Sequence, residues 1–370
     1  MYGLCLSDPH PDRASDGSPI RTLSAARFAG RYRLVDFVLS NMVNSHIYSI
    51  GMVLNSHYQS LIEHIGMGKD WDLARKTGGV RFFPPYLADE RKSVNSEIDG
   101  PLQRAAEYIA DAKEEHIILA DSSIVYNIDY RHVVEAHKIY GADVTAIYVK
   151  KQVSPAERET SIVFDIGESG RVGGVGIAQY TTLSQNVSLG AYVMHKRFFI
   201  QLIAGEKNCG MLRFSRTLIA NALESLRIMG YEFKGYTAHI HSIETFFSCN
   251  MEMLNNDKRK SLFDFEGRRI FTNRRDSLPA RYGKTARINN SLVADGCHID
   301  GHVENSIICR NVKIAAGAVV KNCILQDDTV VEKSASLDCV ITDRLVTVSE
   351  NRSMMGSRSY PVYIDRARVV

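Results

Sequence analysis

Three aspartates, one histidine and one arginine crowd a short loop near the start of the chain. The loop reads SDPHPDRASDG at residues 7–17, directly after the β-type run Tyr2–Leu6. In an α/β sheet, the loop after the first strand commonly holds a phosphate through backbone N–H groups and positive charge. Three aspartates against one arginine give this loop a net charge of −2, and Pro9 and Pro11 have no N–H to donate. The sequence therefore predicts a loop that disfavours phosphate.

A metal site is the alternative interpretation of these aspartates. Carboxylate oxygens of Asp8, Asp12 and Asp16 are ligands that hard divalent cations prefer. The oxygens would have to converge on one point, and the two prolines hinder such a turn. We therefore favour a solvated loop and expect no metal there.

The composition limits the classes of protein to consider. The chain has 370 residues, 45% of them apolar, and this length predicts two domains. With 45 basic and 42 acidic residues, dispersed basic side chains and one tryptophan, nucleic acid is not an expected partner. Neither an apolar run of about 18 residues nor a secretory leader is visible, so no membrane is expected. Seven cysteines without a C-x-x-C pair predict a reducing, cytoplasmic location, without zinc or disulfides.

The first 250 residues alternate two kinds of pattern. Apolar, β-branched runs at 47–54, 116–120 and 144–149 predict strands, and the spacing in Tyr130–Tyr140 predicts a helix. This alternation predicts an α/β domain with a mixed, mostly parallel sheet covered on both faces. Sites in such folds lie beyond the carboxyl ends of the strands, which is where the opening loop falls.

A different rhythm begins near Arg287. Aliphatic residues return at intervals of about six, with small or polar residues and glycines between them, as in VADGCH and IAAGAV. This period predicts a left-handed parallel β-helix, with an ordinary antiparallel β-domain as the alternative. We expect an α/β domain at 1–250, a charged connector at 251–284 and the β-helix with a C-terminal tail at 285–370.

Two long stretches resemble glucose-1-phosphate adenylyltransferases (ADP-glucose pyrophosphorylases). AGRYRLVDFVLSN at 29–41 resembles F-G-G-K-Y-R-I-I-D-F-x-L-S-N, and WDLARKTGGVRFFPP at 71–85 resembles W-D-L-x-R-x-x-G-G-V-x-x-L-P-P. Shorter matches follow in order: NIDY, SLGAYVM, GY and CVITDR. The resemblance implies a nucleotidyltransferase (Rossmann-like) domain followed by a left-handed β-helix. It also implies a reaction in which ATP and glucose 1-phosphate give ADP-glucose and pyrophosphate with Mg²⁺, toward glycogen.

The phosphate cradle of that family is replaced in this chain. Counting back from FAGRYR places Asp8, Pro9, Pro11 and Arg13 in the family's G-G-x-G-x-R, where all three glycines are absent. Glycine backbones approach the triphosphate closely and donate N–H groups to it. Of the cradle, only the Arg13 cation remains, so we expect weak nucleotide binding at most.

The metal carboxylates of the family are also replaced. The family uses an aspartate in S-G-D-H, which falls on Ser123 here, or on Asp121 if the register slips by two. A second aspartate, in W-x-D-V-G-T, falls on His239. Mg²⁺ prefers oxygen ligands, so we expect no cofactor in this chain and Mg²⁺ in a catalytic partner. His239 and His241 could suggest a transition metal, but polar packing is the interpretation we favour.

The sugar-phosphate contacts are lost in the same way. The family's E-K-P has no counterpart, because residues 172–194 contain no Glu, Lys or Pro. Ser188 and Gly190 keep the other half of that signature, and EIDGP at 97–101 replaces the family's G-T-A-x-A. Each positioned donor or carboxylate commonly contributes on the order of 10²-fold in rate, so these losses together predict negligible catalysis.

Four arginines belong to motifs that are retained. Arg31 and Arg33 lie within FAGRYR at 28–33, Arg27 directly precedes it, and Arg344 ends CVITDR. The resemblance implies an effector site here for a phosphorylated or sulfate-like ligand, and guanidinium groups suit such anions. Surface or subunit-interface salt bridges are the alternative.

These observations predict the regulatory, non-catalytic subunit of a bacterial glucose-1-phosphate adenylyltransferase. Family members are tetramers, and a short solenoid needs capping or a partner, so we expect a hetero-tetramer with a catalytic paralogue. An active nucleotidyltransferase with a remodelled site is one alternative. A β-helix acyltransferase using His298 or His302 is another, from a different class.

Overall fold

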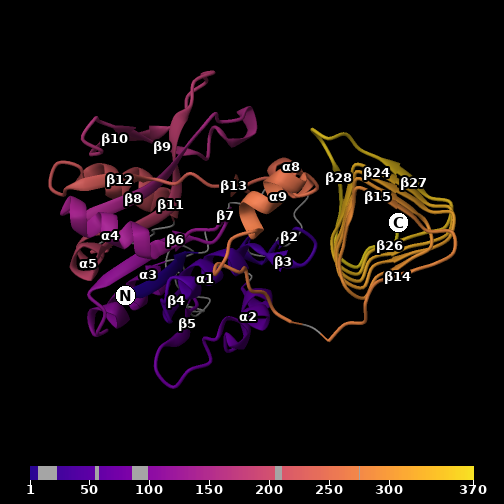
Figure 1. The fold of residues 1–370 in the computed structure, drawn as a ribbon, viewed down its shortest axis with the longest axis horizontal. Coiled ribbons are helices and arrows are strands. Elements are labelled where there is room, and N and C mark those ends of the chain that lie inside the picture. The colour runs from indigo at the N-terminus through magenta and orange to yellow at the C-terminus, as the bar shows by residue number, and fades with distance from the viewer. Residues whose placement is uncertain (7–22, 55–57, 86–98, 205–210, 275) are drawn as a thin grey trace, which may run out of the picture. The chain divides into compact units, whose positions relative to one another are not determined.

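The computed structural model describes residues 1–6, 23–54, 58–85, 99–204, 211–274 and 276–370 (Figure 1). These residues form two compact units. Unit 1 comprises Met1–Ala26, Leu34–His239 and Phe265–Asn273, and unit 2 comprises Arg27–Arg33, Ile240–Asp264 and Arg274–Val370. The chain thus enters unit 2 early, for the FAGRYR segment at 28–33.

Nine strands of the described residues form the sheet of unit 1 (Figure 1). At its centre, β1 (Tyr2–Leu6) lies parallel to β4 (Ser49–Val53) and β6 (His116–Asp121). The long strand β11 (Gln185–His195) runs antiparallel to β6. The other strands are β5 (Gly79–Phe83), β8 (Val144–Lys151), β9 (Ile162–Ile166), β10 (Val172–Ile177) and β12 (Ile228–Glu232). The strands and the helix predicted from the sequence are confirmed.

Helices cover both faces of this sheet. Alternation along β1 places Tyr2 and Leu4 in one core and Cys5 in the other. The first core includes side chains of α3 and α5, and the second includes side chains of α1, α2 and α4. These helices are α1 (Leu34–Asn44), α2 (Gln59–Ile65), α3 (Asp99–Ala110), α4 (Tyr130–Tyr140) and α5 (Lys196–Ile203). Short helical segments are η1 (Leu23–Ala25), η2 (Lys69–Trp71), η4 (Pro155–Glu157), α6 (Met211–Arg213), η5 (Phe214–Leu218) and α7 (Ile219–Ala222).

His137 is buried between α4 and β8, and this makes stability depend on pH. Its Nδ1 lies 2.8 Å from Thr145 Oγ1, and burial lowers the pKa of His137 from 6.5 to about 4. Between pH 6.5 and 4, His137 is therefore protonated in the unfolded chain but stays neutral in the folded chain. We expect the free energy of unfolding to fall by about 3 kcal/mol between pH 6.5 and 4.

Urea unfolding at several pH values measures this effect. The variant His137→Asn should lose most of the decrease, whereas His132→Asn, whose parent side chain is exposed on the same helix, should keep it. Equal pH profiles for the wild type and His137→Asn would show that another group causes the decrease.

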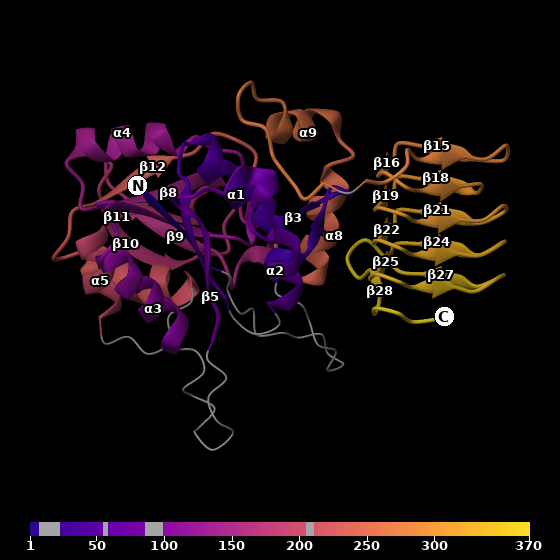
Figure 2. The ribbon, with the colours of Figure 1, turned by 90° about the horizontal axis from the view of Figure 1, so that it is seen from below.

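Three parallel sheets form the β-helix of unit 2, and its coils stack as Figure 2 shows. One sheet contains β14 (Arg281–Tyr282), β17 (His298–Ile299), β20 (Lys313–Ile314), β23 (Val330–Val331) and β26 (Thr347–Val348). The next contains β15 (Arg287–Asn289), β18 (His302–Glu304), β21 (Val319–Lys321), β24 (Ser336–Asp338) and β27 (Ser353–Met355). The third contains β16 (Leu292–Val293), β19 (Ile307–Ile308), β22 (Ile324–Leu325), β25 (Val340–Thr342) and β28 (Val362–Ile364).

The interior of the β-helix confirms the aliphatic rhythm. Ile299, Ile314 and Val331 are stacked residues of one sheet, and all three are fully buried or nearly so. Corner residues adopt the left-handed backbone, such as Asn290 and Asn305, whose side chains also bond to each other at 2.8 Å. Asparagine tolerates this conformation better than most residues, which suits it to the sharp corners. The four cysteines of the β-helix are all buried: Cys297, Cys309, Cys323 and Cys339.

The segment at 251–284, expected as a connector, contains helical structure. α8 (Ile243–Glu252) reaches into it, and α9 (Asn256–Phe263) lies within it. The side chain of Asn255 accepts hydrogen bonds from the N–H groups of Asp257 and Lys258, which caps α9. Half of the α9 residues are charged and most are exposed, so the sequence shows no apolar period there. Among the described residues, no helix has the length and apolar character needed to cross a membrane.

Candidate functional site

The described part of the candidate site lies where β1 and β6 end. Leu6 pairs with Asp121, the last residues of the two strands. Ser122 Oγ donates to the Leu6 carbonyl at 2.8 Å, and Ser24 Oγ lies 2.6 Å from Ser122 Oγ. Ser122 thus links Leu6 to Ser24, which precede and follow the opening loop in the chain. The cradle residues Asp8, Pro9, Pro11 and Arg13, and residues 97–98, lie outside the described residues, so their roles stay predictions.

Asp121 is the carboxylate at this end of the sheet. Its Oδ1 accepts hydrogen bonds from the backbone N–H of Ser123 at 2.7 Å and from Ser123 Oγ at 2.6 Å. Such a bond from an aspartate to the residue two positions later stabilises a tight turn, here between β6 and β7 (Ile124–Val125). Asp121 is buried. Ser123, the predicted position of a metal carboxylate, therefore donates to Asp121 and presents no carboxylate of its own.

His239 lies beside this turn. β13 (Ala238–His239) pairs antiparallel with β7, and His239 is opposite Ile124, the residue after Ser123. The structure thus brings the two predicted metal positions together, although neither is acidic. Across the described ranges, no group of three or more His, Cys, Asp or Glu side chains is placed to hold a metal ion. The described donors therefore do not fit Mg²⁺, which prefers several oxygen ligands.

Ser188 and Gly190 lie in a bulge of β11 against the same turn. The register of β11 on β8 shifts between Ser188 and Ala191, and the Gly190 N–H donates to Ser188 Oγ at 3.1 Å. Gly190 has a φ of +57°, and a Cβ there would lie 2.8 Å from the Cβ of Asp121. Gly190, one of the two sugar-site residues predicted from the sequence, therefore lies against Asp121, the metal position expected if the register slips by two.

Gly190 is expected to be intolerant of a side chain. Gly190→Ala should lower the free energy of unfolding by about 1–3 kcal/mol, because both the left-handed backbone and the contact with Asp121 oppose a methyl group. Gly173→Ala is the matched control, since a Cβ on that glycine of β10 meets nothing within 4 Å. Chemical unfolding compares the two, and equal losses would mean that the bulge is not held against Asp121.

A buried tyrosine completes the described site. Tyr192 OH lies 3.4 Å from Ser188 Oγ, and burial raises the pKa of Tyr192 to about 12. The hydroxyl therefore stays neutral near pH 7. The side chains of Tyr192, Ser122 and Ser123 thus contribute hydroxyl groups to this region. Neutral hydroxyl groups provide neither the negative charge nor the carboxylate ligands that hold a metal ion in a phosphoryl-transfer site.

The four predicted effector arginines all lie in unit 2. Arg27 begins the hairpin of β2 (Arg27–Phe28) and β3 (Tyr32–Arg33), and its guanidinium forms a buried ion pair with Asp327 of the β-helix. Arg27 Nη1 also donates to the Arg31 carbonyl at 3.3 Å. Arg344 Nη2 lies 3.6 Å from Asp328 Oδ2. These contacts support the salt-bridge alternative for Arg27 and Arg344.

The other two arginines differ from each other. Arg31 is exposed and its guanidinium lies 5.5 Å from the ring centre of Tyr32, whereas Arg33 is buried. Arg27 and Arg344 would have to leave their aspartates to bind an anion. An effector site at the four arginines stays a prediction.

A ladder of charges at one corner of the β-helix was not foreseen from the sequence. Its members occupy successive coils: Asp295, Arg310, Asp327 and Arg344. Backbone hydrogen bonds link these coils at the same corner, from Asn311 N–H to the Asp295 carbonyl, from Asp328 N–H to the Arg310 carbonyl and from Leu345 N–H to the Asp327 carbonyl. Arg310 Nε donates to Asp295 Oδ1 at 3.3 Å, and its backbone N–H donates to Asp327 Oδ1 at 3.3 Å. The spacing of 17 between residues 310, 327 and 344 was the available signal, because paired residues in these coils lie 17 apart.

The histidines considered for acyl transfer lie on two different sheets. His298 Nε2 lies 3.5 Å from Asp300 Oδ2, and His302 Nε2 lies 3.5 Å from Glu304 Oε2. Each imidazole thus has a carboxylate neighbour from its own coil, which accounts for its position without a substrate.

Comparison with known proteins agrees with this architecture. Residues 24–210 match the nucleotidyl transferase family, and residues 278–357 match the GlmU-like C-terminal hexapeptide family. The chain is therefore a nucleotidyltransferase-type domain joined to a hexapeptide β-helix, and the predicted fold class is confirmed.

Relatives that match both parts are more specific. The glycogen biosynthesis protein GlgD of Bacillus subtilis is 30% identical over 370 residues, covering 100% of this chain and 96% of the relative. The glucose-1-phosphate adenylyltransferase of Thermosipho africanus is 31% identical over 299 residues, covering 80% and 72%. That of Pseudothermotoga lettingae is 31% identical over 323 residues, covering 86% and 76%. The chain belongs to the glucose-1-phosphate adenylyltransferase family.

Proposed function

We propose that the chain acts in glycogen biosynthesis as a regulatory, catalytically inactive subunit of a glucose-1-phosphate adenylyltransferase. Its relative in Bacillus subtilis, which it matches from end to end, is named a glycogen biosynthesis protein. The observation that carries the proposal is the turn at Asp121 and Ser123 beside His239. The family scaffold is present there, but the residue types do not supply a metal site.

The chemistry explains why these losses matter. Transfer of a nucleotidyl group requires a positioned triphosphate and a metal that neutralises its charge. At the turn, Asp121 Oδ1 accepts two hydrogen bonds from Ser123. His239, which counting along the motifs assigns to the second metal carboxylate of the family, lies opposite Ile124. We therefore derive no catalytic step for this chain, and assign Mg²⁺ and turnover to a catalytic partner subunit.

Exposed apolar side chains in the last coils of the β-helix support assembly with that partner. Met355 is 77% exposed and Tyr360 is 81% exposed. Leu345, Tyr363 and Val369 are large exposed apolar residues of the same region. Contiguous apolar surface and open coil ends are typical of solenoid faces that a partner covers. We propose a hetero-tetramer in which the last coils of the β-helix contact the catalytic chain.

Mixing experiments test the proposed function. The chain is combined with an active glucose-1-phosphate adenylyltransferase from the same source, followed by size-exclusion chromatography and assay of ADP-glucose. We expect one larger species whose rate or effector response differs from that of the catalytic chain alone. Met355→Glu should weaken this assembly, whereas Met67→Glu, at an 80% exposed methionine of unit 1, should not. Separate elution with unchanged kinetics would overturn the proposal.

Asp121 keeps one alternative open. It is a buried carboxylate at the end of β6, in contact with the bulge at Gly190, as an active nucleotidyltransferase with a remodelled site would require. Calorimetry on the isolated chain separates the two functions. Tight Mg²⁺-dependent ATP binding that Asp121→Asn abolishes would favour the active enzyme, and absence of ATP binding would favour the regulatory subunit.

A further inference from the structure

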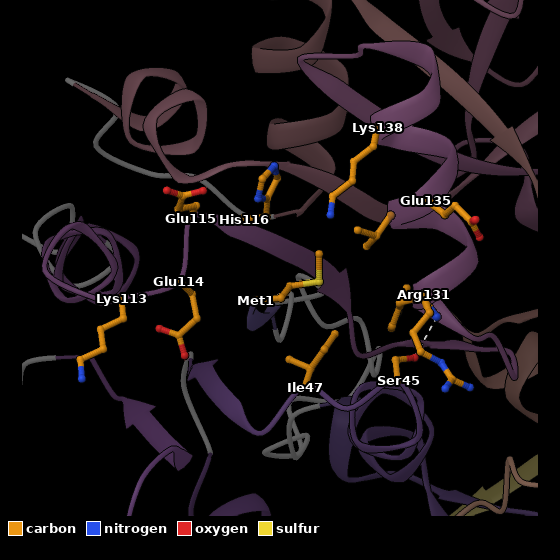
Figure 3. Close-up of a pocket in the computed structure, with 12 residues that line it drawn as sticks. Met1, Ser45, Ile47, Lys113, Glu114, Glu115, His116, Arg131, Glu135 and Lys138 are labelled. Atoms are coloured by element: carbon orange, nitrogen blue, oxygen red, sulfur yellow. Dashed lines mark hydrogen bonds between the residues drawn. The ribbon is translucent and has the colours of Figure 1, made fainter.

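A cavity of about 760 Å³ opens at the amino ends of β1, β4 and β6 in unit 1 (Figure 3). The candidate site described above lies at the carboxyl ends of these strands, so the cavity is at the opposite edge of the sheet. Its walls come from the start of β1, the turn before β4, the turn before β6, and α4. Volumes of about 300–1,000 Å³ are typical of sites for small molecules.

The cavity combines an apolar surface with charged groups. Met1, Ile47 and Val134 supply the apolar part, and Figure 3 shows Met1 near its centre. Ile47 is buried, and Met1 and Val134 are half-buried. A ligand with a small apolar body would therefore meet three apolar side chains that are already in place.

Several of the charged groups around the cavity are engaged elsewhere. Arg131 Nη2 lies 2.6 Å from Asp129 Oδ2, and Glu114 Oε1 accepts a 2.6 Å hydrogen bond from Ser49 Oγ. Lys113 and Glu135 point away from the centre in Figure 3. The net charge that a ligand meets in the cavity therefore differs from the simple sum of acidic and basic lining residues.

Lys138 and His116 face the cavity among the remaining polar groups, which also include the Glu115 carboxylate and the N-terminal amino group of Met1. In the part of the chain that the structure describes, the Lys138 side chain makes no ion pair or hydrogen bond, and the His116 ring packs edge-on against the rings of His137 and His195. Figure 3 shows the Lys138 ammonium directed into the cavity, on the side where His116 lies. Burial, with the charges of His195 and Lys138, lowers the pKa of His116 below 6.5. Near pH 7 the pair thus offers one positive charge and one neutral imidazole N–H.

We propose that this cavity binds a small organic oxyanion. A phosphate or carboxylate group lies against Lys138 and His116, and the apolar body lies on Met1, Ile47 and Val134. A lysine ammonium and an imidazole N–H are suitable donors for such a head group, because charge-assisted hydrogen bonds are the strong ones. This site is separate from the degenerate nucleotide site and does not depend on the proposed function.

Calorimetry with phenyl phosphate on the full chain, near neutral pH and low ionic strength, tests the proposal. Phenyl phosphate should bind more tightly than inorganic phosphate, which lacks the apolar body, and than benzyl alcohol, which lacks the charge. Benzoate in place of phenyl phosphate distinguishes a carboxylate from a phosphate preference. Lys138→Met should weaken binding by about tenfold or more, because a charge-assisted contact is lost.

Matched variants make the result specific. Lys113→Met removes a lysine that lines the same cavity but points away, and it should leave the affinity unchanged. Both lysines are exposed, so both variants are expected to fold. Val134→Ser should weaken phenyl phosphate more than inorganic phosphate. Undetectable binding of phenyl phosphate, or equal binding by the wild type and Lys138→Met, would overturn the proposal.

Discussion

Arg27→Leu is expected to lower the free energy of unfolding of unit 2 by about 3 kcal/mol. Arg27 joins the FAGRYR hairpin to the β-helix through its ion pair with Asp327, and both side chains are almost fully buried. Removing one partner leaves the Asp327 carboxylate buried, with the Arg310 N–H at 3.3 Å as a remaining donor. A buried charge that loses its counter-charge is far more costly than an exposed one.

Hydrogen exchange of residues 324–348 in the full chain measures this loss locally, and urea unfolding measures it globally. Arg31→Leu is the control in the same hairpin, because the parent side chain is exposed. The double variant Arg27→Leu with Asp327→Leu should be more stable than Arg27→Leu alone, since it no longer buries a charge. Unchanged exchange in Arg27→Leu would show that the ion pair does not hold the hairpin.

His64→Leu is expected to cost about 3 kcal/mol in unit 1. His64 Nε2 lies 2.6 Å from Asp36 Oδ1, and the Asp36 side chain has no exposed surface. Asp36 belongs to α1 and His64 to α2, so this contact fixes one helix on the other. The ring of His64 also packs edge-on against Trp71 at 5.7 Å between centres. Leucine would keep part of this packing but no hydrogen bond.

A double-mutant cycle with Asp36→Asn separates the charge from the packing. A carboxamide carries no charge, so the cost of His64→Leu should be smaller in the Asp36→Asn background. Urea unfolding of the four proteins gives the coupling. If His64→Leu costs the same in both backgrounds, the packing against Trp71 rather than the contact with Asp36 explains the loss.

Local patterns predicted most of the fold. The apolar runs gave β1, β4, β6 and β8, because buried strands of a parallel sheet are apolar along their whole length. The spacing of about six residues between aliphatic side chains predicted the β-helix, because each short strand of a coil points one aliphatic residue into the interior. The charged segment at α9 was missed, since an exposed helix with a polar surface has no apolar period.

The candidate site was less predictable, because it depends on contacts between distant residues. The ion pair of Arg27 with Asp327 joins positions 300 residues apart, and only the folded chain identifies the partner. In the structure, His239 lies opposite Ile124, the residue after Ser123. Counting along the motifs assigned Ser123 and His239 to the two metal positions of the family, and that assignment stays a prediction. Counting could not show that Asp121, two residues before Ser123, is the carboxylate that occupies the turn, since that depends on where β6 ends.

The steady-state rate of ADP-glucose formation by the purified chain alone tests the central claim most directly. The assay contains ATP, glucose 1-phosphate and Mg²⁺ at saturating levels, with an active glucose-1-phosphate adenylyltransferase chain measured alongside. Asp121 is bound by Ser123, and counting along the motifs predicts His239 at the second metal carboxylate of the family, so we expect a rate lower by about 10⁴-fold or more. A rate comparable with that of the active chain would contradict the account.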